Sequence, residues 1–221
     1  MAREAARAGR ARWGDTSVGS GLRVRPEALN SMEMDALDDA EPKLSGQSVL
    51  DTRWAFEQVI GADAMRRALE TVKSSARGVY ESTSALTWVP YSAIRLVHDA
   101  YAREAGRPVD ELLAEVVPLS AERSLTTVWR PLLRTTTDEA LLARLASMYA
   151  RSRSRGTMSA RMTGLGAAIV DVTDWASLPE RDIAPIALAI GTFLRLSGRE
   201  SPAVQATRTA SGVQFRLTWR A

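Results

Sequence analysis

Val213-Gln-Phe-Arg-Leu-Thr-Trp219 alternates apolar and polar side chains along its whole length. Such alternation is typical of a strand with one buried face, because successive side chains of a strand point to opposite sides of the sheet. The turn Ser211-Gly212 and the stretch Val204–Thr209 before it predict that this strand is half of a hairpin. The residues predicted to face the core are Val213, Phe215, Leu217 and Trp219.

Two further stretches complete the C-terminal pattern. Gly164-Leu-Gly-Ala-Ala-Ile-Val-Asp-Val172 predicts a central strand, with Leu165 to Val172 apolar on both faces. Ile183 to Leu196 predicts an amphipathic helix that ends at Gly198 and covers one face of the sheet. Its apolar stripe consists of Ile183, Ile186, Ala187, Ile190 and Leu194.

Upstream of the sheet, apolar residues recur at helical spacing. Short helices are predicted near residues 54–60, 65–72 and 109–116, the last closed by Pro118. Pro90 opens a longer helix, which Gly106 ends. Thr136-Thr-Asp-Glu139 matches a capping box before an amphipathic helix through Tyr149, and Arg151–Gly156 is predicted to be a polar loop. Helices followed by antiparallel strands predict an α+β fold, in which an N-terminal helical half packs against a C-terminal antiparallel sheet with one covering helix.

Composition predicts one domain and a tail. The chain has 221 residues, of which 45% are hydrophobic, and this suffices for one sizeable core. We assign that domain to residues 46–221. Residues 1–45 are charged and poor in apolar periodicity, which predicts a disordered tail. The alternative for this tail is a short docking segment around Leu29, Met32, Met34 and Leu37.

Charge and cysteine content exclude several classes of protein. The absence of cysteine excludes disulfides and cysteine-ligated metal sites. No run approaches the roughly 18 apolar residues of a membrane span, and no secretory signal is present, so a cytoplasmic location is expected. The net charge is only +3, and the sequence has no clustered run of basic residues long enough to predict a basic face, so no nucleic-acid partner is expected. The arginines at 151, 153, 155 and 161 fit a solvated connection better than a phosphate contact.

No motif points to catalysis. The chain has no Gly-x-Ser-x-Gly turn and no phosphate-binding loop, and Gly164-Leu-Gly166 lacks the third glycine of a dinucleotide fingerprint. The acidic run Asp35–Asp39 lacks the glycine and terminal glutamate of a calcium loop. We therefore expect no enzymatic activity, although an enzyme with an unrecognised site remains an open alternative.

The C-terminal pattern resembles a known family. Gly191–Gly198 and Phe215-Arg-Leu-Thr-Trp219 are similar to a family of paralogous proteins first defined in Myxococcus, and upstream segments at Ser48, at Trp88-Val-Pro-Tyr91 and at Arg130 are compatible with it. That family in turn resembles the ligand-binding superfamily of 4-vinyl reductase domains, haem–nitric-oxide (H-NOX) domains and TRAPP transport subunits. The resemblance would cover about residues 46–220 and implies an apolar pocket between the helices and the sheet.

The chain departs from the specialised branches of that superfamily. Some phenol-sensing relatives use cysteine metal ligands, which are absent here. The H-NOX branch holds haem propionates with Tyr-x-Ser-x-Arg. Here Tyr91-Ser-Ala-Ile-Arg95 has its serine one residue early and precedes the single histidine, His98.

These observations predict a non-catalytic sensory domain that holds a small hydrophobic molecule and signals to a protein partner. The candidate pocket residues are Trp88, Tyr91, Arg95, His98 and Trp129, with Arg95 as an anion clamp. We expect no cofactor, but a haem bound through His98 stays as a less favoured alternative. A protein-interaction module without a ligand is the main competing hypothesis, and a homodimer is left open.

Overall fold

The computed structural model describes residues 41–125 and 133–220. The predicted docking segment around Leu29 and the candidate Trp129 lie outside the described residues. Regular structure begins before Gly46, where the sequence had placed the start of the domain. Lys43–Ser45 form strand β1, which pairs antiparallel with β2, Trp88–Pro90.

The C-terminal sheet is antiparallel, with strand order β3-β4-β6-β5. The four strands are β3, Thr157–Gly164; β4, Ala167–Thr173; β5, Glu200–Thr209; and β6, Gly212–Arg220. The predicted hairpin is confirmed by the pairing of β5 with β6, and so is the predicted core face of β6, where Val213, Phe215, Leu217 and Trp219 are all buried. Since antiparallel strands follow a helical half, the predicted α+β class is confirmed.

Two details of the sheet differ from the prediction. Strand β3 was not expected, because its apolar positions Met158, Ala160 and Met162 are weak strand signals. Leu165 was placed in the central strand, but it lies in the turn between β3 and β4 and is 94% exposed. Gly166 follows it with φ 65°, a conformation that favours glycine and directs the chain into β4. Along β4 buried and half-buried residues alternate, because helices cover only one face of the sheet.

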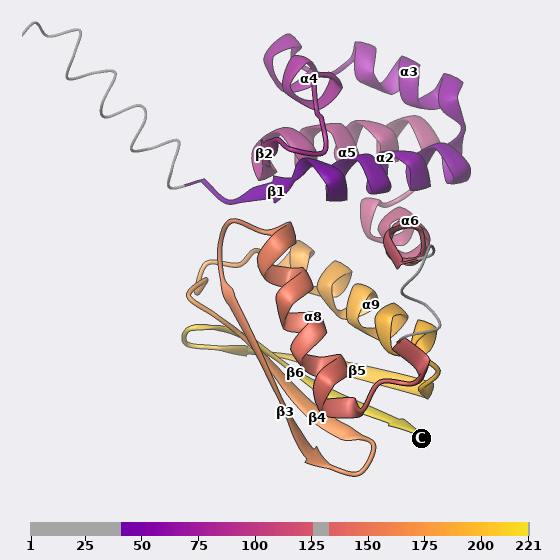
Figure 1. Cartoon of the computed structure of the whole chain (residues 1–221). Coiled ribbons are helices and arrows are strands. Elements are labelled where there is room, and N and C mark those ends of the chain that lie inside the picture. Colours follow the sequence, from indigo (N-terminus) through magenta and orange to yellow (C-terminus); the bar gives the residue numbers. More distant parts are fainter. Residues whose placement is uncertain (1–40, 126–132, 221) are drawn as a thin grey trace, which may run out of the picture. The chain divides into compact units, whose positions relative to one another are not determined.

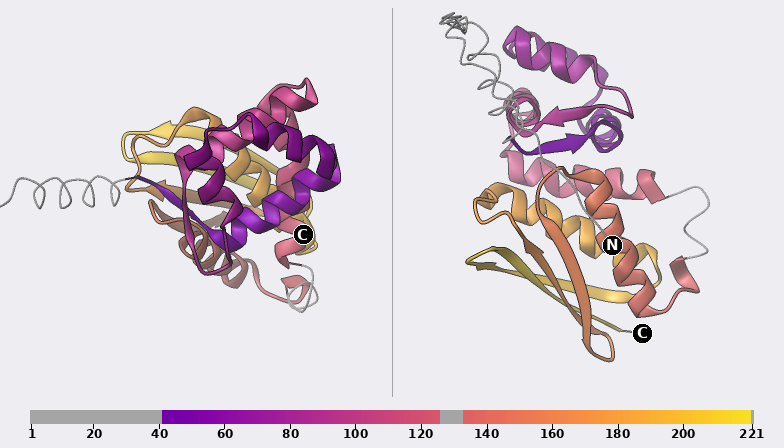
Figure 2. Two further views of the ribbon diagram at one scale, coloured as in Figure 1. Left: turned by 90° about the horizontal axis from the view of Figure 1, so that it is seen from above. Right: turned by 60° about the vertical axis from the view of Figure 1, so that its left-hand side comes forward.

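Helix α9, Glu180–Leu196, lies on one face of this sheet as predicted, and helix α8, Asp138–Ser152, lies on the same face (Figure 1). The right-hand view of Figure 2 shows the sheet in profile with both helices on one side. The cap of α8 is Thr137, whose side chain accepts from the Ala140 amide, and not Thr136. Arg151 and Ser152 belong to α8, so the predicted polar loop is shorter than expected.

The N-terminal half consists of five helices in the described part of the chain: α2, Gly46–Ile60; α3, Ala62–Glu70; α4, Ser74–Glu81; α5, Tyr91–Ala105; and α6, Val109–Leu125. Gly106, with φ 63°, ends α5 as predicted. Helix α4 was not expected. Pro118 was predicted to close α6, but the helix continues to Leu125. The apolar stripe of Leu113, Val117 and Leu125 runs past the proline, and its burial outweighs the roughly 3 kcal/mol cost of proline in a helix.

Two groups of buried side chains form the core. One joins α8 and α9 to the sheet and contains Phe193 and Phe215. The other lies among the five helices α2, α3, α4, α5 and α6 and contains Phe56 and Tyr101. Leu44 of β1 packs against both. Among the described helices, none combines the length and the apolar character that a bilayer span requires.

Candidate functional site

A cavity of about 240 Å³ lies where the two groups of core residues meet. Side chains from α2, α5, α6, α8 and α9 line it, together with residues of β1 and β3. Most of its wall is apolar. The apolar lining residues are Leu44, Ile94, Leu113, Val117, Ala121, Leu125, Leu145, Met148, Met158, Pro185, Ile186, Ala189, Ile190 and Phe193.

Helix α5 contributes three of the residues that the sequence singled out. Tyr91, Arg95 and His98 are four and three residues apart, which places them on one helix face, and all three line the cavity. Trp88 does not. It lies on β2, where the neighbouring Val89 is buried, and strand alternation turns the Trp88 side chain outward, leaving it 46% exposed.

Helices α5 and α9 are joined by two ion pairs beside the cavity. Arg95 of α5 pairs with Asp182 of α9, and the Arg181 Nη2 atom of α9 lies 2.9 Å from the Asp99 Oδ1 atom of α5. All four side chains are partly buried, so water and salt screen the attraction within these pairs less than they would screen it in fully solvated pairs. The charge of each arginine is therefore balanced by a carboxylate within the protein.

His98 is held as a neutral imidazole. Its ring packs against Phe56 with a centroid distance of 4.7 Å. Burial, with a smaller contribution from the Arg181 guanidinium, lowers the pKa of His98 to about 4. At neutral pH this side chain adds a polar nitrogen to the cavity wall but no charge.

Arg153 is a cavity residue that the sequence analysis placed in a solvated connection. It follows α8 directly, and its backbone forms a bridge with Leu44. Its guanidinium carbon lies 4.9 Å from the centre of the Tyr149 ring, and Nη1 donates to the Ser152 hydroxyl at 3.1 Å. The Nε–H group is buried and has no acceptor in the described part of the chain. Nothing in the sequence distinguished Arg153 from its neighbours, because its burial depends on β1, more than a hundred residues away.

The two tyrosines near Arg153 are neutral donors. Burial raises the pKa of Tyr149 to about 12, and burial also raises the pKa of Tyr91 above its usual value, although the Arg153 charge opposes both shifts. Both phenols therefore keep their protons at neutral pH. The Tyr91 ring is further fixed by an edge-on contact with Trp175 at 5.5 Å.

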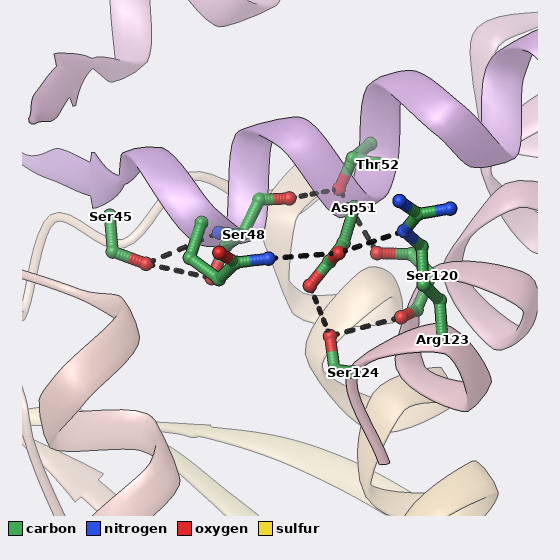
Figure 3. Close-up of polar contacts among 8 residues, drawn as sticks. Ser45, Ser48, Asp51, Thr52, Ser120, Arg123 and Ser124 are labelled. Atoms are coloured by element: carbon green, nitrogen blue, oxygen red, sulfur yellow. Dashed lines mark hydrogen bonds and ion pairs between the residues drawn. The ribbon is translucent and has the colours of Figure 1, made fainter. Parts of the chain in front are cut away.

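A polar cluster joins α2 to α6 at another part of the wall (Figure 3). Its centre is Asp51, whose side chain is 5% exposed. The Asp51 carboxylate accepts from Gln47 Nε2 at 3.1 Å, from Arg123 Nε at 3.2 Å and from the Ser124 hydroxyl at 2.6 Å. The cluster thus satisfies a buried charge and fixes the two helices in register. Four hydroxyl-bearing residues nearby line the cavity: Ser48, Thr52, Ser120 and Ser124.

No model of a known protein family matches the chain, and no curated protein matches it in sequence. Solved structures do match. The H-NOX protein from K. algicida, in its unliganded Fe(II) form, gives a TM-score of 0.59 at 12% identity, covering 80% of this chain and 97% of that one. An oxygen-binding H-NOX domain related to soluble guanylate cyclases gives 0.57 at 13% identity, covering 80% and 96%. A point mutant of the T. tengcongensis H-NOX gives 0.56 at 13% identity, covering 80% and 98%.

The chain has an H-NOX-like fold. This likeness confirms the expected distant similarity to H-NOX domains at the level of the fold. Membership of the Myxococcus family stays a prediction.

The residues around the cavity do not fit a haem. The cavity is smaller than the roughly 300–1,000 Å³ of sites for drug-sized ligands, and a haem is larger than most such ligands. Ser92, in the stretch that resembles the propionate motif, is exposed and does not line the cavity, and its backbone amide donates to the Glu41 carboxylate at 2.9 Å. Arg95, the arginine of that stretch, is paired with Asp182. A bare metal ion is a separate matter from haem: among the described residues, no group of three or more histidine, aspartate or glutamate side chains is placed to hold one.

Proposed function

We propose that this chain is a non-catalytic sensory domain that holds a small, largely apolar molecule in the cavity and signals its presence to a protein partner. The observation that carries the proposal is the cavity itself, with its volume of about 240 Å³ and its mainly apolar wall. An apolar cavity of about 150 Å³ is sufficient to bind benzene in an engineered protein, so this one has room for a substituted ring or a short branched chain.

The fold supports a sensory function by analogy. One of the solved neighbours is an oxygen-binding domain related to soluble guanylate cyclases. Fold alone does not carry function to this chain, because function depends on the residues of the site. Here those residues favour an organic molecule over a haem.

The two ion pairs between α5 and α9 give a physical route from the cavity to a partner. Arg95, Asp182 and Arg181 line the cavity, and all take part in the pairs that join the helices. A ligand that fits better when α5 and α9 are slightly apart, or slightly closer, shifts the population between those arrangements by its difference in affinity. A partner that contacts either helix would then detect the ligand.

Native mass spectrometry of the recombinant protein, combined with its visible absorption spectrum, tests this proposal. We expect a retained small mass, or saturable binding of added toluene or indole, and no Soret band. A Soret band that disappears in His98→Leu would show a haem protein and overturn the proposal. A protein that retains no mass and binds neither probe would overturn it in favour of the second candidate.

That second candidate is a protein-interaction module whose cavity has no ligand. The exposed apolar side chains between α4 and α5 favour it, since Leu86 is 94% exposed and Trp88 46% exposed. Under this candidate, substitution of Leu86 and Trp88 by serine would abolish partner binding, and filling the cavity would leave it unchanged.

A further inference from the structure

We propose that the molecule held in the cavity carries an anionic group, a carboxylate in the simplest case, and that Arg153 binds it. This inference rests on the proposed function and specifies the class of its ligand. The occupant would be a small aromatic or branched aliphatic acid, with its apolar body against the wall of α6 and α9 and its carboxylate at Arg153.

The charges of the cavity lining support this assignment. The lining contains three arginines and one aspartate. Arg95 is balanced by Asp182, and Arg181 by Asp99. Arg153 has no carboxylate within ion-pair distance among the described residues, and His98 is neutral because its pKa is about 4. Among the described residues, one positive charge at the cavity is therefore uncompensated, and a singly charged anion would balance it.

The hydrogen bonds of Arg153 point the same way. Its Nε–H, like that of Arg95, is buried without an acceptor among the described residues, which is unfavourable for a charged donor. Its Nη1 donates to the neutral Ser152 hydroxyl at 3.1 Å, and its other side-chain contact of this kind is with the neutral Tyr91 hydroxyl. A carboxylate can accept two parallel hydrogen bonds from a guanidinium, and a ligand that did so would satisfy donors that the protein leaves weakly bonded.

The surroundings of Arg153 fit an acid better than a neutral polar group. The Tyr149 ring lies beside the guanidinium, and the Tyr91 hydroxyl interacts with it. Burial raises the pKa of the Tyr91 hydroxyl, so Tyr91 keeps a proton that it can donate to a second carboxylate oxygen. The sequence had assigned the anion clamp to Arg95, but the pairing of Arg95 with Asp182 leaves that function to Arg153.

Matched acids and amides test the inference. Isothermal titration calorimetry at neutral pH would compare benzoate with benzamide, and 3-methylbutanoate with its amide, on the full chain. Toluene serves as the uncharged probe of the cavity. The variants are Arg153→Gln, which removes the charge, and Arg153→Lys, which keeps it. The control is Arg216→Gln, which removes the same charge from an exposed position on β6.

We expect at least one acid to bind about tenfold or more tightly than its amide, as a charge-assisted pair requires. Arg153→Gln should remove this preference and leave toluene binding unchanged, Arg153→Lys should keep part of it, and Arg216→Gln should keep all of it. Equal binding of acid and amide, or toluene binding without acid binding, would overturn the inference and leave the proposed function intact. Failure of all the probes to bind to a folded protein would overturn both.

Discussion

Filling the cavity with a larger side chain on α9 should weaken ligand binding and at the same time stabilise the folded protein. Ala189 lines the cavity, and Ala189→Leu adds three carbon atoms to its wall. Each buried methylene stabilises the folded state by about 0.8 kcal/mol, so full burial of the added atoms would contribute about 2 kcal/mol. In a fully packed core the same change would cost about 1–3 kcal/mol through strain.

The volume of the cavity decides whether Ala189→Leu stabilises or destabilises the folded state. About 240 Å³ exceeds the space that three carbon atoms require, so we expect the burial contribution to dominate. A gain of about 1–2 kcal/mol corresponds to a rise in Tm of roughly 2–8 °C for a chain of this size. Binding of toluene or of the preferred acid should weaken by at least tenfold, because the added side chain occupies the same space.

Thermal unfolding followed by circular dichroism, without ligand, measures the first effect, and calorimetry measures the second. Ala184→Leu is the control, since Ala184 is exposed on the same helix and should change neither quantity. A fall in Tm for Ala189→Leu, with ligand binding intact and the control unchanged, would refute the reasoning, because it would show that no free space lies beside Ala189.

Three further predictions concern the wall and its supports. The pKa of His98 is lowered to about 4, so between pH 6.5 and 4 the unfolded chain binds more protons than the folded one, and stability should fall by up to about 3 kcal/mol as pH decreases through this window. Urea titrations across that range should show a smaller fall for His98→Leu, and equal falls would contradict the lowered pKa. Arg199→Ala should lower the free energy of unfolding by about 3 kcal/mol, because the Arg199 side chain is 10% exposed and donates to Asp138 and to the Thr136 carbonyl. Arg199→Lys should restore only part of this free energy, since lysine lacks the planar guanidinium. Full restoration by lysine in urea unfolding would contradict the need for that group. Asp51→Ala should cost about 2–4 kcal/mol by the same assay, whereas a loss below 1 kcal/mol would mean that the α2–α6 cluster is not needed for folding.

The elements that could be predicted from sequence are those whose signals are local. Alternation in β6 and helical spacing in α9 each depend on neighbours within a few residues, and the glycine that ends α5 acts through its own φ angle. Strand β3 was missed because methionine and alanine mark its inward positions weakly. The end of α6 was wrong because burial, a tertiary effect, outweighed the local preference of Pro118.

The candidate site also contains some features that local sequence signals predict and others that depend on tertiary contacts. Tyr91, Arg95 and His98 could be grouped from the sequence because a helix face is a local property, and all three line the cavity. The partner of Arg95 was not predictable, since Asp182 lies 87 positions further along the chain and many other carboxylates were equally available. Trp88 was misplaced because the strand that turns it outward, β2, is only three residues long.

The likeness to H-NOX domains and the mismatch with haem have one physical explanation. A fold is specified by the pattern of buried apolar positions, which many sequences satisfy, so a TM-score near 0.6 can persist at 12% identity. A ligand is specified by a few polar groups in fixed positions, and each can be lost without disturbing that pattern. In this chain Arg95 forms an ion pair within the protein, Ser92 is exposed, and Arg153 has a buried Nε–H with no acceptor among the described residues. Under the proposed function, the apolar scaffold encloses a space for a ligand, and the polar groups of this chain favour a small acid over a metal-bearing macrocycle.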